Sequence, residues 1–452
     1  MPHAPEPGAP LTAPRVSYFT LGCRLNQHDT AAIRASLAAA GWGEAREGED
    51  PDVIVVNTCT VTARADQEAR QAVRRLAREH PEARLVVTGC WAQRAPAEAA
   101  ALPGVALVAG TAERDRLASL LGSPARGVPG VAREGAAAVA VAPARSRRPF
   151  VPSAPVSFGR TRALLKVQDG CDSFCAYCVV PMVRGRSRSL PLADALDQAR
   201  RLLEAGFHEL VLTGADLGSY GKDLGEPALL PRLVEALLAL GGCHRVRISS
   251  IEPNKVDPVL VAMIGAEPRL CRHLHLPLQS GSPAVLRAMR RPYAPEDYAR
   301  LTEAVAARGT VAIGADVIVG HPGEGAAEFE ETVRFLERLP LSYLHVFRYS
   351  PRPGTRAALL SGRAGQAEAR ERSARLRALG ERKRAAFQRS LLGSVLPALP
   401  EGADPDPCRA MTDVYAPVLL ARRPERRGIV DVRVDGIAGG ALTGSLLLPP
   451  AG

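Results

Sequence analysis

Apolar and polar positions alternate in two ways along the first quarter of the chain. Short apolar runs are typical of buried strands, and the longer stretches between them carry apolar residues at helical spacing. Strands that alternate with helices in this way predict a parallel sheet with helices packed on it. The expected strands are Val16–Thr20, Val53–Asn57, Arg84–Gly89 and Val105–Gly110, and the expected helices are Asn26–Ala40 and Arg64–Glu79.

The same alternation resumes in the central part of the chain, from about residue 160. Six strand–helix repeats are too few for a closed eightfold barrel, so the pattern predicts an open, partial barrel. The expected strands are Ala163–Gln168, Glu209–Thr213, Arg245–Ser250, His273–Leu278, Ala312–Val319 and Tyr343–Tyr349, with helices such as Leu192–Ala205 and Ala228–Leu240 between them.

The remaining segments complete an α/β chain of several domains. A helical segment from Ser361 to about Leu392 precedes short apolar strands at Val414–Leu420, Gly428–Val434 and Ala441–Leu448. Stretches rich in Pro, Ala, Gly and Arg without periodicity predict a tail and a linker. We therefore expect a disordered tail (1–14), an N-terminal domain (15–125), a linker (126–157), a central barrel (158–390) and a small C-terminal β module (391–452).

Three cysteines with C-x3-C-x2-C spacing follow the first strand of the predicted barrel: Cys171, Cys175 and Cys178. Thiolates are soft ligands that suit iron–sulfur clusters. Three of them hold three irons of a [4Fe–4S] cluster and leave the fourth iron open for a substrate. The alternatives are unrelated thiols or a structural zinc site, but zinc needs a fourth ligand at matching spacing, and no Cys or His pair follows closely.

Three more cysteines each follow a predicted strand of the N-terminal domain: Cys23, Cys59 and Cys90. Because the carboxyl ends of parallel strands share one edge of a sheet, we expect these side chains to converge. Gly22 and Gly89 would let the backbone turn tightly beside a bulky ligand. Small cysteines are also common core residues, but three at equivalent strand ends favour a second cluster.

The sequence strings around these cysteines resemble a known family. The spacing in CDSFCAYC is that of the radical S-adenosylmethionine (SAM) enzymes, and TLGCRLNQHDT, VNTCTVTARAD and VTGCWAQ are similar to the N-terminal domain of the methylthiotransferases. The resemblance covers nearly the whole chain. Within that family, the strings GCRLNQHDT, LKVQDGCDSFCAYC and GADVIVGHPGE favour the type that acts on N6-threonylcarbamoyladenosine in tRNA.

The resemblance implies two [4Fe–4S] clusters, SAM and a radical reaction. The cluster on Cys171, Cys175 and Cys178 would bind SAM at its open iron and release a 5′-deoxyadenosyl radical, which removes the C2 hydrogen of the adenine. The cluster on Cys23, Cys59 and Cys90 would carry the sulfur of the methylthio group. The implied substrate is the adenosine just 3′ of the anticodon, at position 37, where bases can be splayed into a pocket.

Further residues that would hold SAM are expected at the strand ends of the barrel. The resemblance places the adenine near Tyr177, beside the third cysteine. The other candidates are Thr213 and Gly214 for the amino group, Ser249 and Glu252 for the ribose or amino group, Gln279, and Gly320 in the turn on the adenine side. His321 stands where the family pattern has a phenylalanine. For each polar group an ordinary loop role is the alternative.

Charge and composition say less about function than the cysteine motifs do. The net charge of +11 and a pI of about 9.5 suit a nucleic-acid partner. However, the positive charge is nearly all arginine in a chain rich in Ala, Gly and Pro, which a G- and C-rich codon bias also produces. Three arginines of the linker would contact RNA or lie in a solvated loop: Arg145, Arg147 and Arg148. The C-terminal module resembles the TRAM RNA-binding barrel, without an evident aromatic stacking platform.

The remaining cysteines have no partner spacing, and we interpret them as structural: Cys243, Cys271 and Cys408. Without a signal peptide or an apolar run of ~18 residues, the chain is expected in the cytoplasm and away from membranes. The expected partners are tRNA and an electron donor such as a flavodoxin or ferredoxin. Alternatives are methylthiolation of isopentenyl adenosine or of a ribosomal aspartate, and an iron–sulfur RNA-binding or redox-sensing protein without catalysis.

Overall fold

The computed structural model describes residues 14–122, 137–144, 150, 161–226, 229–402, 406–425 and 427–447. Its chain divides into two compact units. The N-terminal unit is formed by Met1–Ala154 with Val180–Gly185, and the C-terminal unit by Pro155–Val179 with Arg186–Gly452. Apart from Pro14, the expected tail lies outside the described residues, and so do the linker arginines Arg145, Arg147 and Arg148.

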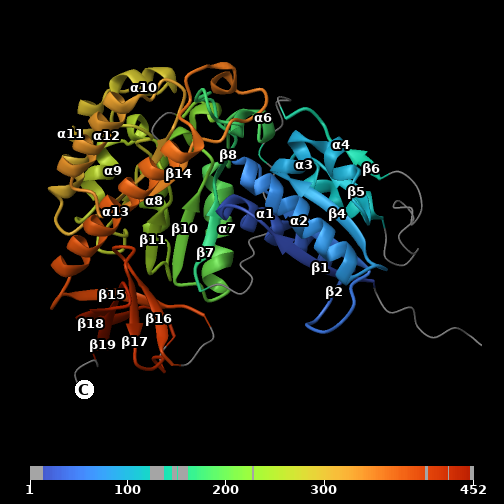
Figure 1. Ribbon diagram of the computed structural model, residues 1–452. Coiled ribbons are helices and arrows are strands. Elements are labelled where there is room, and N and C mark those ends of the chain that lie inside the picture. Colours follow the sequence, from blue (N-terminus) through green and yellow to red (C-terminus); the bar gives the residue numbers. More distant parts are fainter. Residues whose placement is uncertain are drawn as a thin grey trace, which may run out of the picture. The chain divides into compact units, whose positions relative to one another are not determined.

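The N-terminal unit contains the predicted parallel sheet, with strand order β2-β1-β3-β4-β5-β6 (Figure 1). The strands are β1 (Arg15–Thr20), β2 (Gly43–Glu44), β3 (Val53–Thr58), β4 (Arg84–Gly89), β5 (Val105–Ala109) and β6 (Ala138–Ala140). The helices are α1 (Arg24–Ala39), α2 (Ala63–Glu79), α3 (Cys90–Arg94), α4 (Pro96–Ala100) and α5 (Leu117–Leu121), with a 3-10 turn at Arg114–Arg116. The four strands and two helices expected from the sequence are all present.

Helices cover both faces of this sheet because the strand side chains alternate. On one face, Ile54 and Val56 of β3 pack with Val73 of α2. On the other face, Val53 and Val55 pack with Leu37 of α1. The apolar runs that predicted buried strands are therefore the two-sided core of the sheet.

Strand β6 lies within residues 126–157, which the sequence predicts to be a linker. Residues Ala138–Ala140 pair in parallel with β5, where Leu107 lies opposite Ala138. Three residues are too few to show alternation, and alanine is a poor strand former. The pairing is supplied by the edge of β5, which the local sequence does not reveal.

The C-terminal unit begins with six parallel strands in chain order, as predicted for an open partial barrel. The strands β11-β10-β7 form one sheet and β12-β13-β14 form another, and parallel bridges such as Ser250–His275 join them. The strands are β7 (Ala163–Lys166), β10 (Glu209–Thr213), β11 (Arg245–Ile248), β12 (His273–His275), β13 (Ala312–Val319) and β14 (Tyr343–Arg348).

Helices follow these strands and cover the outside of the partial barrel (Figure 1). They are α7 (Leu192–Glu204), α8 (Leu229–Leu238), α9 (Pro258–Met263), α10 (Pro283–Ala288), α11 (Pro295–Ala306), α12 (Ala326–Arg338) and α13 (Gln366–Ser390). A small antiparallel pair, β8 (Gln168–Asp169) and β9 (Arg188–Ser189), flanks the cysteine loop, and α6 (Val180–Val183) follows it. Within the described part of the chain, no helix has both the length and the apolar character needed to cross a membrane.

The predicted C-terminal β module is a closed barrel of five strands in the order β15-β16-β17-β19-β18. The strands are β15 (Val395–Pro400), β16 (Cys408–Thr412), β17 (Pro417–Leu420), β18 (Val430–Ala438) and β19 (Ala441–Leu446). The sequence predicted only the last three of them. In β15, Pro397 and Pro400 hide the strand signal because proline is rare inside sheets.

Candidate iron–sulfur sites

The three N-terminal cysteines lie at the same edge of the first sheet. Cys23 follows β1 at the start of α1, Cys59 follows β3, and Cys90 is the first residue of α3, directly after β4. The three strands are neighbours in the sheet. These cysteines are at least 31 positions apart in sequence, and they come together because neighbouring parallel strands end at the same edge of the sheet.

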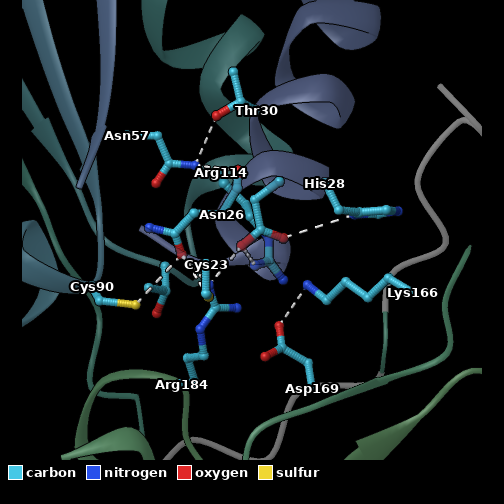
Figure 2. Close-up of polar contacts among 12 residues, drawn as sticks. Cys23, Asn26, His28, Thr30, Asn57, Cys90, Arg114, Lys166, Asp169 and Arg184 are labelled. Atoms are coloured by element: carbon cyan, nitrogen blue, oxygen red, sulfur yellow. Dashed lines mark hydrogen bonds and ion pairs between the residues drawn. The ribbon is translucent and has the colours of Figure 1, made fainter. Parts of the chain in front are cut away.

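Asn26 connects the three cysteine-bearing loops. Its side-chain oxygen lies 3.9 Å from the sulfur of Cys23 and 4.0 Å from the sulfur of Cys90. Its side-chain nitrogen donates hydrogen bonds to the carbonyls of Leu21 (2.9 Å) and Thr58 (3.0 Å), the residues that lead into the loops of Cys23 and Cys59. Figure 2 shows Cys23, Asn26 and Cys90 together.

A buried cation lies beside these thiols. Arg184 donates to the side-chain oxygen of Asn26 (2.7 Å) and to the carboxylate of Asp29 (3.0 Å), which also pairs with Arg114 (2.8 Å; Figure 2). Burial raises the pKa of Cys90, the charge of Arg184 opposes this and the neighbouring thiols reinforce it, so that the pKa is raised to about 12. A cation at this place favours thiolates, the form that ligates metals.

The donor set of this sheet edge fits an iron–sulfur cluster. Cys59 and Cys90 are buried. Burial favours their neutral thiol form, and metal binding would replace the thiol protons. Cys23 is exposed, so the site has one open side. Three soft sulfur ligands around one space, with an amide and a guanidinium behind them, would hold three irons of a [4Fe–4S] cluster.

The second cysteine set lies in the loop after β8. Cys171 and Cys175 are buried and Cys178 is partly buried. The loop is fixed by its backbone: the N–H of Ala176 donates to the carbonyl of Met289 (2.9 Å), and its carbonyl accepts from the N–H of Ala357 (2.8 Å). Because segments more than 100 residues away position the loop, its three sulfurs are held without needing local regular structure.

Hydrogen-bond donors point at the sulfurs of this loop. The backbone N–H of Ser173 lies 3.4 Å from the sulfur of Cys171, and Nη1 of Arg291 lies 3.5 Å from the sulfur of Cys175. Burial and the nearby carboxylate of Asp216 together raise the pKa of Cys171 to about 12. Donors on cysteine sulfur stabilise the thiolate form, so this loop also fits a three-cysteine cluster.

Three charged residues around this loop did not stand out in the sequence: Asp216, Lys255 and Arg291. Lys255 donates to Asp216 (2.5 Å) and to Ser173 (2.9 Å), so the carboxylate beside Cys171 is paired. Arg291 pairs with Glu252 and also donates to the carbonyl of Pro277 (2.8 Å). Arg291 and Glu252 lie far apart in sequence, so no local pattern links them. For Lys255, the only signal is that lysine is rare in this chain.

The structure brings two predicted SAM residues to the cysteine loop. The ring of Tyr177 meets the ring of His321 edge to face, with centroids 6.3 Å apart. Glu252 reaches the loop through Arg291. His321 is fully buried, its Nδ1 bonds the carbonyl of Pro322 (2.8 Å), and burial lowers its pKa, so its neutral form is favoured.

The other predicted residues lie at strand ends but face protein atoms. The hydroxyl of Thr213 donates to the carbonyl of Val211 (3.2 Å). Gly214 packs against Gln168, and a Cβ there would lie 2.8 Å from its Oε1. Ser249 is buried directly after β11.

Two predicted positions have left-handed backbone conformations. Gln279, with a φ of 72°, bridges β13 through the carbonyl of Asp316 (2.8 Å). Gly320, with a φ of 77°, donates its N–H to Glu324 (2.7 Å). Cys243, Cys271 and Cys408 are buried, as expected for structural residues.

Comparisons with known proteins agree with this architecture. Residues 15–110 match the uncharacterized protein family UPF0004, and residues 165–336 match the radical SAM superfamily. The chain is 37% identical over 395 residues to the threonylcarbamoyladenosine tRNA methylthiotransferase MtaB of Bacillus subtilis (strain 168), which covers 86% of this chain and 85% of that protein. The chain belongs to the radical SAM methylthiotransferases, as a member of the MtaB type.

Other relatives of this methylthiotransferase are named for a different substrate. It is 36% identical over 403 residues to the tRNA-2-methylthio-N(6)-dimethylallyladenosine synthase of Novosphingobium aromaticivorans, with 88% of both chains covered. Among solved structures, the radical SAM methyltransferase TsrM from Kitasatospora setae matches with a TM-score of 0.51 and 17% identity, over 74% of this chain and 72% of that one. This structural likeness concerns the fold alone.

Proposed function

We propose that this methylthiotransferase modifies tRNA, replacing the C2 hydrogen of N6-threonylcarbamoyladenosine at position 37 with a methylthio group. The observation that carries the proposal is the similarity over most of the chain to relatives named for this reaction, from Bacillus subtilis, Aquifex aeolicus and Thermotoga maritima. The net charge of +11 suits a polyanionic substrate. The proposed partners are the tRNA and a flavodoxin- or ferredoxin-type electron donor, in the cytoplasm.

The two cysteine sets would have separate roles. Cys171, Cys175 and Cys178 would hold the cluster that binds SAM, and Cys23, Cys59 and Cys90 would hold an auxiliary cluster. When bound, these groups supply the electron, the radical and the sulfur that an unreactive C2–H bond requires. The proposed SAM contacts are Tyr177, Thr213, Gly214, Ser249, Glu252, Gln279 and Gly320.

The chain's own residues position this chemistry. Asn26 and Arg184 fix the loops of the auxiliary site, and both are buried. Arg291 and Lys255 place positive charge beside the loop of the SAM site while pairing with Glu252 and Asp216. The burial of Cys171 and Cys175 keeps bulk water from two of the three sulfurs, which protects reactive species from side reactions.

The second candidate is dimethylallyladenosine (isopentenyl adenosine) in tRNA. The relative from Novosphingobium aromaticivorans favours it at nearly the same identity. The two substrates differ only in the group on N6, which is charged in one and apolar in the other. Residues that meet this group therefore decide between the two reactions.

Mass spectrometry of tRNA nucleosides tests the proposal. Cells that lack this gene are complemented with wild type, Cys59→Ala or Cys175→Ala. We expect 2-methylthio-N6-threonylcarbamoyladenosine only with wild type. Purified Cys59→Ala should still form 5′-deoxyadenosine from SAM, whereas Cys175→Ala should form none. An unchanged nucleoside after deletion contradicts the substrate, and 5′-deoxyadenosine from neither wild type nor Cys59→Ala contradicts catalysis.

A further inference from the structure

Strand β14 presents a row of rings on one face of the partial barrel. Tyr343, His345, Phe347 and Tyr349 occupy every second position, so their side chains share a face. Helix α13 packs on the opposite face, where a Cβ on Gly380 would lie 3.2 Å from Leu344. The side chain of His345 is 52% exposed, and Phe347 is 46% exposed. The two residues are neighbours on the inner face of the barrel, where such exposure is unusual.

This row of rings leads to the cysteine loop of the SAM site. The ring of Tyr349 lies 5.2 Å from that of His321, which lies 6.3 Å from that of Tyr177, next to Cys178. His345 lies on the same strand, four residues before Tyr349. At about 3.3 Å per residue, His345 lies about 13 Å from Tyr349 along the strand, with Phe347 between them on the same face.

Hydrogen bonds hold the imidazole of His345 in a defined state. One carboxylate oxygen of Asp316 lies 2.8 Å from Nε2 of His275 and 3.2 Å from Nδ1 of His345. Burial would raise the pKa of Asp316, but its hydrogen bonds to His275 and His345 and their charges hold it well below the usual range. An ionised carboxylate only accepts hydrogen bonds, so Nδ1 of His345 carries a proton and Nε2 remains for a ligand.

A chain of hydrogen bonds from His273 through Tyr343 and His275 also holds Asp316 in place. Nδ1 of His275 lies 3.0 Å from the hydroxyl of Tyr343, which lies 2.8 Å from Nε2 of His273. The negative charge of Asp316 is therefore shared between two imidazoles. In its protonated form, His345 would carry a second N–H, at Nε2, that can donate to an anion.

A cavity of about 500 Å³ opens beside this residue. It is large enough for a small-molecule side chain. Its lining includes Tyr343, His345 and Phe347 of β14, Arg377, Glu381 and Arg384 of α13, and Tyr415 of the small barrel. Leu344 and Val346 also line it, so the cavity reaches both faces of β14, an edge strand of its sheet. The cavity thus combines a flat apolar ring with cationic groups and one carboxylate, that of Glu381, which pairs with Arg384. Every one of these residues belongs to the C-terminal unit.

We propose that this cavity receives the N6 substituent of the substrate adenosine and that His345 binds its carboxylate, with the base against Phe347. The inference rests on the proposed function, because only the threonylcarbamoyl group carries a carboxylate. A dimethylallyl group would offer no carboxylate to the cationic side chains of this cavity. A site built for a polar group rejects an analogue that lacks it far more strongly than an apolar pocket rejects an extra group.

Binding measurements with three RNAs test the role of His345. Anticodon stem–loops carrying adenosine, N6-threonylcarbamoyladenosine or its methyl ester at position 37 are titrated against the cluster-loaded wild type and His345→Gln. We expect the substitution to weaken binding of the threonylcarbamoyl RNA about tenfold, as for loss of one charged hydrogen bond, and to leave the adenosine RNA unchanged. The methyl ester should bind wild type as weakly as the acid binds the variant.

The matched control is His244→Gln, an exposed histidine of the same unit whose ring lies beside His208. It should keep the wild-type preference, and both variants should keep wild-type iron content and 5′-deoxyadenosine formation. An unchanged preference in His345→Gln overturns the inference. So does a stoichiometric divalent metal in wild type that His345→Gln lacks, because His275, Asp316 and His345 would then be metal ligands.

Conversion by wild type is measured in parallel for the threonylcarbamoyl RNA and for a fourth stem–loop that carries dimethylallyladenosine at position 37. Conversion together with an unchanged preference in His345→Gln overturns the role of His345 and keeps the proposed function. If wild type converts only the dimethylallyl RNA, the proposed function fails and the inference fails with it. The two failures are therefore distinguishable.

Discussion

Arg245 donates to Glu209 through both Nε (2.8 Å) and Nη2, and neither side chain is more than 2% exposed. Arg247 donates to the other carboxylate oxygen of Glu209 at 2.7 Å. The same two arginines donate to carbonyls of the small barrel, namely Pro397, Met411, Thr412 and Asp413. One carboxylate at the start of β10 therefore orients two cations that join the six-stranded barrel to the C-terminal barrel.

Replacing Glu209 with Gln should strongly destabilise the C-terminal unit. The variant keeps the size of the side chain but leaves two buried guanidinium groups without their counter-charge, which costs about 3–5 kcal/mol. Urea denaturation monitored by circular dichroism measures the free energy of unfolding. The exposed residue Glu235, changed to Gln, is the control. A loss below about 1 kcal/mol for Glu209→Gln would contradict this account.

The same carboxylate should make stability depend on pH in the acid range. Burial acts to raise the pKa of Glu209, but the charges of Arg247 and Arg245 outweigh it and lower the pKa from 4.5 to about 2. A lowered pKa in the folded state stabilises the fold above the unfolded pKa. This contribution is lost as the pH falls from about 4.5 toward 2. The difference in unfolding free energy between wild type and Glu209→Gln should shrink over this interval, and a constant difference would refute the assignment.

Substituting Gly22 with Ala should damage the N-terminal cysteine site. A Cβ on Gly22 would lie 2.6 Å from the Cβ of Cys59 and 3.2 Å from its sulfur. Gly48 is a matched control because it also has a positive φ (85° against 105°), while a Cβ there meets nothing within 4 Å. Both substitutions carry the backbone cost of about 1 kcal/mol. Only Gly22→Ala should displace the sulfur of Cys59.

Iron content distinguishes these two variants. Each is placed in a full-length chain whose Cys171, Cys175 and Cys178 are changed to alanine, so that iron reports the N-terminal site alone. We expect iron at the control level for Gly48→Ala and a loss of more than half for Gly22→Ala. Equal iron in both variants would mean that Cys59 can shift without harm.

Replacing Arg184 with Gln should weaken the same site through charge. The side chain of Arg184 is 3% exposed, and its loss leaves the buried carboxylate of Asp29 with less positive charge around it. Breaking a buried pair completely costs about 3–5 kcal/mol, and the loss should be smaller here because Arg114 still pairs with Asp29. Lower stability of the N-terminal unit and less bound iron are expected together. Arg186→Gln, whose arginine is 56% exposed, should change neither.

The sequence predicted the cysteines better than the residues that support them. Cys23, Cys59 and Cys90 follow apolar runs, so a local pattern and the geometry of parallel strands place them together. Arg184 contacts Asp29 across 155 residues, and no local pattern links the two. The chain order also hides that Val180–Gly185, two residues after Cys178, packs with the N-terminal unit.

The row of rings on β14 was hidden for a different reason. The run Tyr343–Tyr349 predicted a strand, but every second residue of a strand can face either a core or an open cavity. Only the exposure of His345 and Phe347 distinguishes the two cases. Strand β15 was missed because its prolines resemble loop residues, although the barrel supplies the pairing.

Arg291 should set the reduction potential of the cluster proposed for the cysteine loop. Its Nη1 lies 3.5 Å from the sulfur of Cys175, and hydrogen bonds and positive charge near cluster sulfurs favour the reduced state. Arg291→Gln removes the charge and leaves the carboxylate of Glu252 without its partner. Both effects make reduction harder. We expect the potential to fall by about 60 mV, the one-electron equivalent of about 1.4 kcal/mol.

The measurement is a redox titration followed by electron paramagnetic resonance. It uses the full-length chain with Cys23, Cys59 and Cys90 changed to alanine, so that only the cluster of the loop contributes. Arg287→Gln, at an exposed arginine of α10, controls for loss of a charge at the surface. If Arg291→Gln and Arg287→Gln have the same potential, Arg291 holds the loop in place through Pro277 and Tyr293 and does not tune the cluster.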